Sequence, residues 1–299
     1  MPLIEIQLQY NEIRNVSCCP CIIISFSGSY FQIAGAVFVE VFTIQRFTDY
    51  EYLGGDPFNS KQINHAAKIF HVVSQAVATL RQYYYLLRPQ LSPQSARLLP
   101  SPTYIPGSSP SGELVFNGRF SFEGRKLDDY DRSLFQGTYG GKTVLIKFCE
   151  KYGEVGHRML ASVGLAPSLY FCSVILGDVF MVVMDLIDGR SAYHRFKHQK
   201  LPQTVLNDVK RALEILHAHD LVFGDLQRHN IMVVNSSDKG DEEQHGLLVG
   251  FDWGGNVGEA KYPATFNMSG EVDWVDGVAP EVEIKKEHDL GMLEKLVDG

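Results

Sequence analysis

The proline- and serine-rich stretch from residue 88 to residue 112 constrains the fold of this chain more than any other feature. It reads RPQLSPQSARLLPSPTYIPGSSPSG, with six prolines and no strong helical or strand periodicity. Proline fixes one backbone torsion and lacks an N–H donor, so this composition favours an extended, semi-rigid spacer. The sequence therefore predicts two separate modules, residues 1–87 and residues 113–299, joined by a linker.

The composition of the whole chain allows both modules to fold. Of its 299 residues, 45% are hydrophobic and 21% are charged, which argues against wholesale disorder. The formal net charge of −8 argues against a nucleic-acid-binding protein, because no dense Lys/Arg stripe is present to displace counterions from phosphates. Five cysteines, an odd number, and no cleavable signal peptide indicate a reducing compartment, so the expected location is cytoplasmic or nuclear.

The first module contains an uncharged segment, residues 16–39, that includes the cysteine cluster CCPC at 18–21. No second ligand pair follows at zinc-site spacing, so the thiols are more simply the start of a buried strand than a metal or redox site. The absence of charge raises the alternative of a membrane span. Pro20, Gln32 and several Ser and Gly residues interrupt the segment, which favours a folded hairpin and no membrane contact.

The rest of the first module has the pattern of a small α/β unit. Two or three strands are expected across residues 16–48, and an amphipathic helix across residues 61–87. A helix covering a small sheet accounts for this pattern, and no complete catalytic set is visible, so only a structural or interaction role is expected. The helical stripe consists of Ile63, Ala66, Phe70, Val73, Val77, Leu80, Tyr84 and Leu87.

The second module has strand patterns first and helical patterns afterwards. Strands are expected between residues 113 and 149, and a hairpin between 168 and 189 with its turn at 176–178. An amphipathic helix follows over residues 202–220. This order predicts an α+β arrangement. The apolar face of the predicted helix consists of Val205, Val209, Leu213 and Leu216.

Four polar residues of the second module follow or interrupt apolar runs. Lys147 lies near the end of the strand-like run VLIKF. Asp225 and Asn230 stand five residues apart between two apolar runs, and Asp252 follows in the phrase FDW. Lysine, acid, amide and acid in this order are typical of the protein-kinase fold.

Over about residues 120–297 the sequence resembles kinase-like proteins, and more closely a fungal family of kinase-like domains. The resemblance implies an α+β, bilobal kinase-like fold with a β-rich N-lobe, a helical C-lobe and a short C-terminus, preceded by a small α/β module. It also implies ATP and Mg²⁺ as cofactors. The phrases that carry it are VFGDL at 222–226, NIMV at 230–233, FDWG at 251–254, Tyr262-Pro263 and Glu287-His288-Asp289.

The resemblance implies a role for each polar residue. Lys147 would hold the α- and β-phosphates, with Glu154 on the next helix as the candidate to hold Lys147 in place. Asp225 would orient the acceptor hydroxyl and accept its proton. Asn230 and Asp252 would bind Mg²⁺.

Three further matches are shorter. Met184 would line the adenine slot and the backbone from Asp185 to Ile187 would bind the base, although an ordinary buried strand explains the same residues. Asp289 would accept hydrogen bonds from the catalytic-loop backbone, with a surface acid as the alternative. The tripeptide at 279–281, Ala-Pro-Glu, matches the end of kinase activation segments.

Three departures from the kinase pattern bear on activity. Gly250 occupies the position of the expected Mg²⁺-binding aspartate, and Asp252 is expected to replace it only if the backbone shifts by two residues. The expected nucleotide-covering turn, residues 125–134, contains no glycine. Gln227 stands where kinases place a cation for the γ-phosphate, and the neighbouring Arg228 is the candidate to compensate.

The leading hypothesis is a kinase-like domain that binds ATP and transfers phosphate to a Ser/Thr hydroxyl of a protein substrate or partner. A pseudokinase or scaffold module is the first alternative, motivated by Gly250 and the glycine-free turn. A small-molecule kinase of the aminoglycoside or choline type is the second, motivated by Gly224-Asp225 in place of Arg-Asp.

Overall fold

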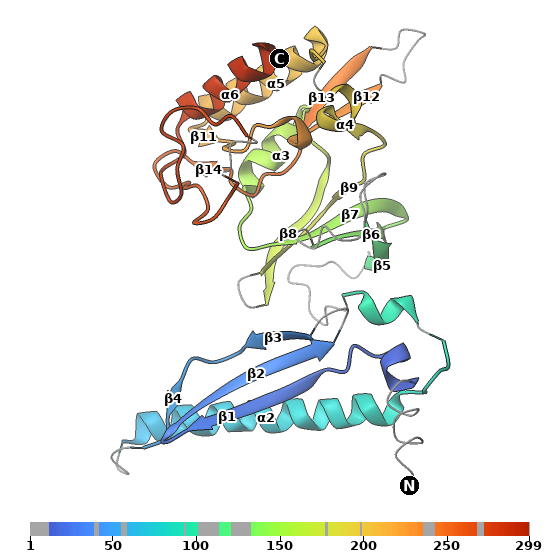
Figure 1. Cartoon of the computed structure of the whole chain (residues 1–299), viewed down its shortest axis with the longest axis vertical. Helices are drawn as coiled ribbons and strands as arrows, with labels where there is room; N and C mark the ends of the chain where they lie inside the picture. Colours follow the sequence, from blue (N-terminus) through green and yellow to red (C-terminus); the bar gives the residue numbers. More distant parts are fainter. Residues whose placement is uncertain are drawn as a thin grey trace. The chain divides into compact units, whose positions relative to one another are not determined.

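The chain divides into two compact units, Met1–Ser101 and Pro102–Gly299 (Figure 1). The boundary lies inside the proline-rich stretch of the sequence. The computed structural model describes residues 12–38, 42–54, 59–92, 94–100, 114–120, 133–176, 179–197, 199–235, 243–267 and 272–298.

The first unit contains a four-stranded antiparallel sheet in the order β1-β2-β3, with β4 also pairing with β2. A tight turn joins the first two strands, and its Gly28 has the left-handed φ of +60° that glycine adopts without strain. The uncharged segment thus folds as a hairpin. The strands are β1 (Cys21–Ser27), β2 (Tyr30–Phe38), β3 (Phe42–Arg46) and β4 (Glu51–Tyr52).

A single long helix, α2 (Ser60–Leu86), lies along the sheet of the first unit (Figure 1). The side chain of Asn59 caps its N-terminus by accepting a hydrogen bond from the Gln62 N–H at 3.3 Å. Phe70 of the helix stacks on Phe31 of β2 with ring centroids 4.9 Å apart. The predicted helix is confirmed, but none of its described side chains is buried.

Part of the proline-rich stretch belongs to the first unit. The Asn15 side chain donates to the carbonyls of Gln90 and Leu91 at 2.9 and 3.0 Å, and the Gln94 N–H donates to the Asn15 carbonyl at 2.7 Å. A short 3₁₀ turn, η1 (Ser95–Leu98), follows. This part of the stretch therefore packs on the unit, rather than forming the extended spacer expected from its proline content.

The second unit begins with a five-stranded antiparallel sheet in the order β5-β6-β7-β9-β8. Val144 and Ile146 of β7 are fully buried, whereas the alternate residues Leu145 and Lys147 face the other side of the sheet. Helix α3 (Glu154–Ser162) follows β7. The strands are β5 (Leu114–Arg119), β6 (Ser133–Tyr139), β7 (Lys142–Cys149), β8 (Leu169–Leu176) and β9 (Val179–Asp185), of which the last two form the predicted hairpin.

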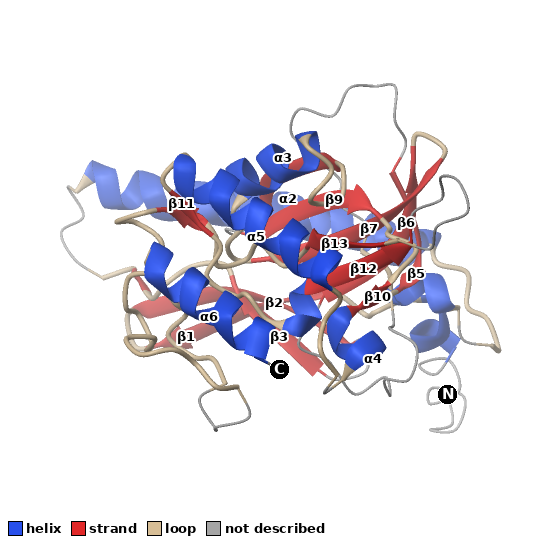
Figure 2. Ribbon diagram, turned by 90° about the horizontal axis from the view of Figure 1, so that it is seen from above, coloured by secondary structure: helices blue, strands red, loops and turns tan. Residues whose placement is uncertain are grey.

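The helical part of the second unit packs around α5 (Gln203–Ala218), which lies beside α6 (Lys286–Asp298) (Figure 2). All four residues of the predicted apolar face of α5 are at most 1% exposed, so that prediction is confirmed. The unit is a mixed α+β fold. Its remaining elements are β10 (Arg190–Ser191), α4 (Ala192–Phe196), β11 (Leu221–Val222), η2 (Arg228–Asn230), β12 (Ile231–Asn235), β13 (Gln244–Leu248) and β14 (Gly255–Asn256).

Among the described residues, no helix combines the length and the apolar character that crossing a bilayer requires. The longest, α2, has 27 residues but carries charged side chains such as Lys61, Lys68 and Arg81.

Candidate functional site

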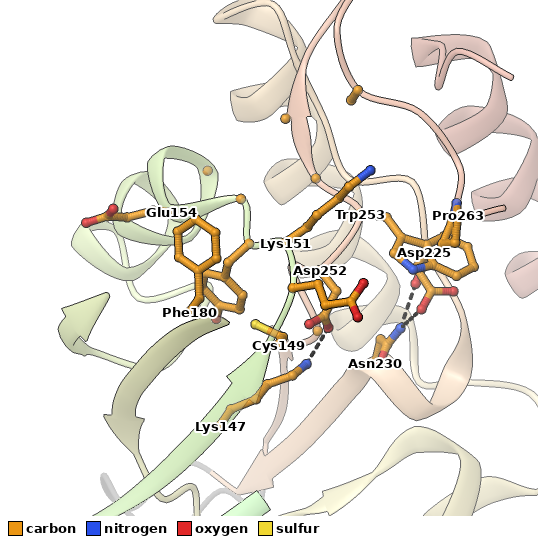
Figure 3. Close-up of a pocket in the computed structure, with 18 of the residues that line it drawn as sticks. Lys147, Cys149, Lys151, Glu154, Phe180, Asp225, Asn230, Asp252, Trp253 and Pro263 are labelled. Atoms are coloured by element: carbon orange, nitrogen blue, oxygen red, sulfur yellow. Dashed lines mark hydrogen bonds and ion pairs between the residues drawn. The ribbon is translucent and has the colours of Figure 1, made fainter. Parts of the chain in front are cut away.

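A cleft of about 1610 Å³ lies within the second unit (Figure 3). Strand β7 and the start of α3 line one side, and the loop that carries Asp225 and Asn230 lines the other. The segment from residue 249 to residue 265 also contributes, with Asp252 and Trp253. Lys147, Asp225, Asn230 and Asp252, which are far apart in sequence, therefore share one cavity.

Lys147 reaches the cleft from the middle of the sheet. Its backbone is held between Leu134 of β6 and Val182 of β9, so its position is determined on both sides. Its ammonium group forms an ion pair with the Asp252 carboxylate. The two side chains are 17% and 29% exposed, so the pair is accessible from the cleft without being fully solvated.

Cys149 lies two residues beyond Lys147 and also lines the cleft. Burial, with a smaller contribution from the charge of Asp252, raises the pKa of its thiol to about 12. At neutral pH this cysteine is therefore a neutral thiol beside the ion pair, and not a nucleophilic thiolate.

Glu154 is not where the kinase pattern leads us to expect it. Its carboxylate accepts a hydrogen bond from Arg158 Nε at 2.7 Å, one helical turn along α3. Figure 3 shows its side chain directed away from Lys147. The structure thus pairs Lys147 with Asp252, and the expectation that Glu154 holds Lys147 is wrong here, because the first turn of α3 directs Glu154 along the helix surface.

Asp225 and Asn230 meet because the loop between them turns back through η2. The Asn230 amide nitrogen donates to the Asp225 carboxylate at 2.7 Å and to the Asp225 carbonyl at 2.9 Å. The Gln227 side chain donates to the other carboxylate oxygen at 2.7 Å. Asn230 is only 4% exposed, so these bonds hold the acid in one orientation at the cleft wall.

Asp289 anchors the start of the same loop. Its carboxylate is 1% exposed and accepts from the N–H groups of Phe223 and Gly224 at 2.9 and 2.8 Å. His217 also lies 3.0 Å from it. The predicted hydrogen bonds from Asp289 to the backbone of this loop are therefore present. Gly224 has a φ of +82°, and a Cβ there would lie 2.8 Å from Ile284, so the backbone itself requires glycine before Asp225.

Phe251 joins the loop segment to α3. Its ring stacks in parallel on His157 with centroids 4.6 Å apart and meets Phe223 edge-on at 5.3 Å. The Phe251 carbonyl accepts from the Gly153 N–H at 2.7 Å, at the N-terminus of α3. Phe251 thus packs between α3 and Phe223, which precedes Asp225 by two residues.

His157 is buried and neutral. Its Nε2 lies 2.8 Å from the Pro167 carbonyl, which only accepts, so Nε2 carries the proton and Nδ1 accepts from the Tyr152 hydroxyl at 2.7 Å. Burial lowers the pKa of His157 to about 4. No local signal in the sequence indicates that this histidine packs on Phe251.

Gly250 is required by the geometry around Asn230. Its φ is +80°, and a Cβ at this position would lie 2.6 Å from the Asn230 amide oxygen. An aspartate at 250 would therefore need Asn230 to move. The acid lies instead at 252, and Asp252 reaches Lys147 while Phe251 stays buried. Residues 251–253 lie in a turn and not in a strand, so Asp252 lines the cleft while the neighbouring Phe251 is buried.

Arg228 does not face the cleft. Its guanidinium donates to the carbonyls of Lys197 and Gln199 at 2.9 and 2.7 Å, just after α4. Burial lowers the pKa of this guanidinium from its usual value. The expectation that Arg228 replaces a γ-phosphate cation is wrong in this structure, because those two carbonyls hold it. The cleft contains two other exposed cations, Lys151 and Lys261, for which the sequence carries no distinguishing signal.

Of the residues predicted to bind adenine, only Met184 lines the cleft. Met184 is 4% exposed and lines the cleft, whereas Asp185 and Ile187 do not line it. The Asp185 N–H donates to the Ser168 carbonyl at 2.9 Å, and the Ile187 carbonyl accepts from the Gly189 N–H at 3.1 Å. The Asp185 N–H and the Ile187 carbonyl therefore already have hydrogen-bond partners within the protein. The predicted nucleotide-covering turn lies mostly outside the described residues, since 121–132 are not among them.

An aromatic cluster lies at the far end of the cleft. Tyr262 is 2% exposed, packs edge-on against Trp253 at 5.7 Å, and its hydroxyl lies 3.1 Å from His288 Nδ1. Burial raises the pKa of Tyr262 above its usual value. The Tyr-Pro phrase and the buried His288 of the Glu-His-Asp phrase thus meet in one cluster, which the sequence alone did not indicate.

Comparison with known proteins leaves the family open. No protein-family profile matches the chain. No curated protein sequence matches it either. Among solved structures, the chain is similar to the kinase PK-1 of Cydia pomonella granulovirus, with 13% identity and a TM-score of 0.37. The similarity covers 52% of this chain and 58% of the viral kinase, so it spans little more than half of that protein. What the chain binds has to be inferred from the cleft itself.

Proposed function

We propose that the second unit is a bilobal, protein-kinase-like phosphotransferase domain that binds ATP with Mg²⁺ in the cleft and transfers phosphate to a Ser/Thr hydroxyl of a protein. The observation that carries the proposal is the convergence of Lys147, Asp225, Asn230 and Asp252 on one cavity. Phosphoryl transfer depends mainly on positioning and on neutralising phosphate charge, and this set of side chains suits both tasks.

Lys147 is the residue suited to the nucleotide phosphates. It is fixed by strand pairing on both sides and its side chain is 17% exposed, which limits the water that competes for its ammonium group. In the absence of nucleotide its charge is matched by Asp252. A bound triphosphate would compete for the same ammonium group and free the Asp252 carboxylate.

Asn230 and Asp252 suit Mg²⁺ because they offer oxygen donors. The amide nitrogen of Asn230 is committed to Asp225, which leaves its amide oxygen as the donor facing Gly250. Carboxylate and amide oxygens are hard ligands of the kind Mg²⁺ prefers. These two residues would hold the ion, which would neutralise the charge of the phosphates when bound.

Asp225 suits the acceptor hydroxyl. Two side-chain amides, from Gln227 and Asn230, donate to its two carboxylate oxygens and hold it at the cleft wall. An acid held in this way can accept the proton of a hydroxyl that approaches the γ-phosphate. The Gly224-Asp225 dipeptide has a backbone reason, so it does not by itself indicate a small-molecule acceptor.

A second candidate is a nucleotide-binding module without turnover. Gly250 and the ion pair between Lys147 and Asp252 favour it, because the one acid that replaces the missing aspartate is already engaged. The charge stabilisation of a metal ion is worth several kcal/mol, and about 4 kcal/mol corresponds to roughly a thousandfold in rate. The fold and nucleotide binding would survive such a loss.

Calorimetric titration of the full chain with ATP, with and without Mg²⁺, tests the nucleotide site. We expect Mg²⁺ to tighten binding, Lys147→Met to weaken it at least about tenfold, and Asp252→Asn to remove the effect of Mg²⁺. Asp273→Asn is the matched control, since this acid is 88% exposed and pairs with Lys295 away from the cleft. Wild-type chain that binds no ATP would overturn the proposal.

Transfer of radiolabelled γ-phosphate to a protein mixture separates the two candidates. We expect Asp225→Asn to lower incorporation by about a thousandfold, because the hydroxyl loses its proton acceptor. Equal incorporation by wild type and variant would rule out the catalytic assignment of Asp225. ATP binding without measurable transfer by the wild type would establish the module without turnover.

A further inference from the structure

Strand β1 lies at one edge of the described sheet of the first unit. It is the first strand in the order β1-β2-β3, and no described strand pairs with its outer side. Its seven residues, CIIISFS, pair with β2 without a bulge and contain no charge and no proline. Natural proteins usually protect such an edge with charges, prolines, bulges or a covering element, because its backbone groups can pair with another strand.

The helix-facing side of β1 is apolar but poorly covered. Ile24 and Phe26 lie opposite Ile33 and Phe31 of β2, so they share the sheet face on which Phe70 of α2 stacks. Ile33 and Phe31 are 3% and 1% exposed, yet Ile24 and Phe26 are 40% and 62% exposed. The helix thus covers the middle of the sheet and leaves the β1 margin of the same face open.

A groove of about 410 Å³ lies between the start of β1 and α2. Ile22 lines it from the strand, and Val77 and Leu80 line it from the helix. A strand added to the edge of β1 would place every second side chain on this face of the sheet, and the side chain opposite Ile22 would lie beside the groove. The complete lining is Pro20, Cys21, Ile22, Val77, Leu80, Arg81 and Tyr84.

The occupant that this edge fits is a second copy of β1. In an antiparallel pair centred on Ile24, the two Ile24 residues lie opposite each other, and Phe26 of one copy lies opposite Ile22 of the other. Opposed side chains on one face are about 5 Å apart. Phe26, which is 62% exposed, is therefore brought beside the groove that Ile22 of the other copy lines. The two-fold axis repeats this contact, so it occurs twice in the interface.

We propose that two copies of this chain associate through β1, antiparallel about a two-fold axis at Ile24, so that their sheets become continuous and each Phe26 enters the groove of the other copy. The interface is independent of the nucleotide site in the second unit. A strand from a different protein would use the same edge, but it would leave the purified chain monomeric.

Light scattering after size-exclusion chromatography of the full chain tests the association. We expect a mass twice the 33.5 kDa of one chain at micromolar concentration. Ile24→Lys should give the monomer, because two lysines would face each other on the axis, while a lysine at this 40% exposed position suits the monomer. Ile44→Lys is the matched control, since Ile44 is 55% exposed on β3 of the same sheet, and it should remain dimeric.

Mixing two variants tests the position of the axis. The Ile24→Lys chain and the Ile24→Glu chain should each be monomeric alone and should form a mixed dimer together, since opposite charges then face each other. Circular dichroism should show that both are folded. A monomeric wild type, an Ile24→Lys chain that stays dimeric, or a mixture that fails to associate would each overturn the proposal.

Discussion

The two units of this chain differ in what they bury. In the second unit His157, Asn230, His288 and Asp289 are all at most 6% exposed, and each has hydrogen-bond partners. In the described part of the first unit the only polar side chain buried to this degree is Ser17. The helix of the first unit has 27 residues and no buried one, and apolar side chains such as Phe26 remain exposed.

This difference separates two kinds of constraint. A buried polar group costs free energy unless it is paired, so the polar groups of the second unit are retained because their hydrogen bonds shape the cleft. Apolar side chains left in water contribute little to the stability of the first unit. Covering them with another surface removes apolar area from water and is therefore favourable in free energy. The second unit buries paired polar groups beside its cleft, whereas the first unit exposes apolar side chains.

Removal of the Asp289 carboxylate should give the largest loss of stability. Asp289→Ala leaves the N–H groups of Phe223 and Gly224 buried without acceptors, which should lower the free energy of unfolding of the second unit by about 3–5 kcal/mol. Both tryptophans of the chain lie in this unit, so tryptophan fluorescence during urea unfolding reports on it selectively. Asp289→Asn keeps one acceptor oxygen and should lose less. A cost below 1 kcal/mol for alanine would contradict the importance of the buried polar network.

Acid should weaken the second unit before its carboxylates titrate. The pKa of His157 falls from 6.5 in the unfolded chain to about 4 in the folded one, so the unfolded state takes up its proton first as pH drops. The contribution of His157 to the free energy of unfolding should therefore be nearly constant above pH 7 and fall by about 2 kcal/mol between pH 7 and pH 5. Burial lowers the pKa of His288 too, and this adds a contribution of the same sign.

The variant His157→Phe separates the two histidines. It keeps an aromatic ring against Phe251 but cannot be protonated, so the dependence on pH should flatten to the part due to His288. Urea unfolding at several pH values, followed by tryptophan fluorescence, measures the slope. An unchanged slope in the variant would show that His157 is not the buried neutral group.

Two glycines with the same backbone conformation separate the cost of backbone strain from the cost of a clash between an added Cβ and a neighbouring side chain. Gly258→Ala adds a Cβ at a φ of +85° with nothing within 4 Å, and should cost about 1 kcal/mol. Gly250→Ala adds the same strain at a φ of +80° plus a clash with the Asn230 amide oxygen, and should cost about 1–2 kcal/mol more. Chemical unfolding measures both. Equal costs would mean that Asn230 moves freely, and that the cleft wall is less rigid than its hydrogen bonds indicate.

The smallest effect is expected on the surface of α2. Val72 is 61% exposed, so Val72→Ser should change the stability of the first unit by less than about 0.5 kcal/mol. Phe31→Leu, at a side chain that is 1% exposed, is the contrasting change and should cost more than about 1 kcal/mol. Hydrogen exchange of α2 amides measures both changes. A large effect at Val72 would show that another surface covers this side of the helix.

Local patterns in the sequence were sufficient for much of the fold. The helix over residues 61–87 and the apolar face of α5 follow from helical periodicity, which depends only on neighbouring residues. The hydrogen bonds of Asp289 were also predictable, because the phrase around it matches a known arrangement. The position of Gln90, Leu91 and Gln94 in the proline-rich stretch was not, since these residues are held by contacts with Asn15.

The sequence by itself determined which residues are candidates for the site, because their order along strands and loops is a local property of the chain. Only the tertiary structure decided their partners: Lys147 pairs with Asp252 and not with Glu154, and Arg228 turns to the carbonyls after α4. The reason is physical, since ion pairs and hydrogen bonds depend on distances of a few ångströms between segments far apart in sequence. Spacing along the chain carries no information at that resolution.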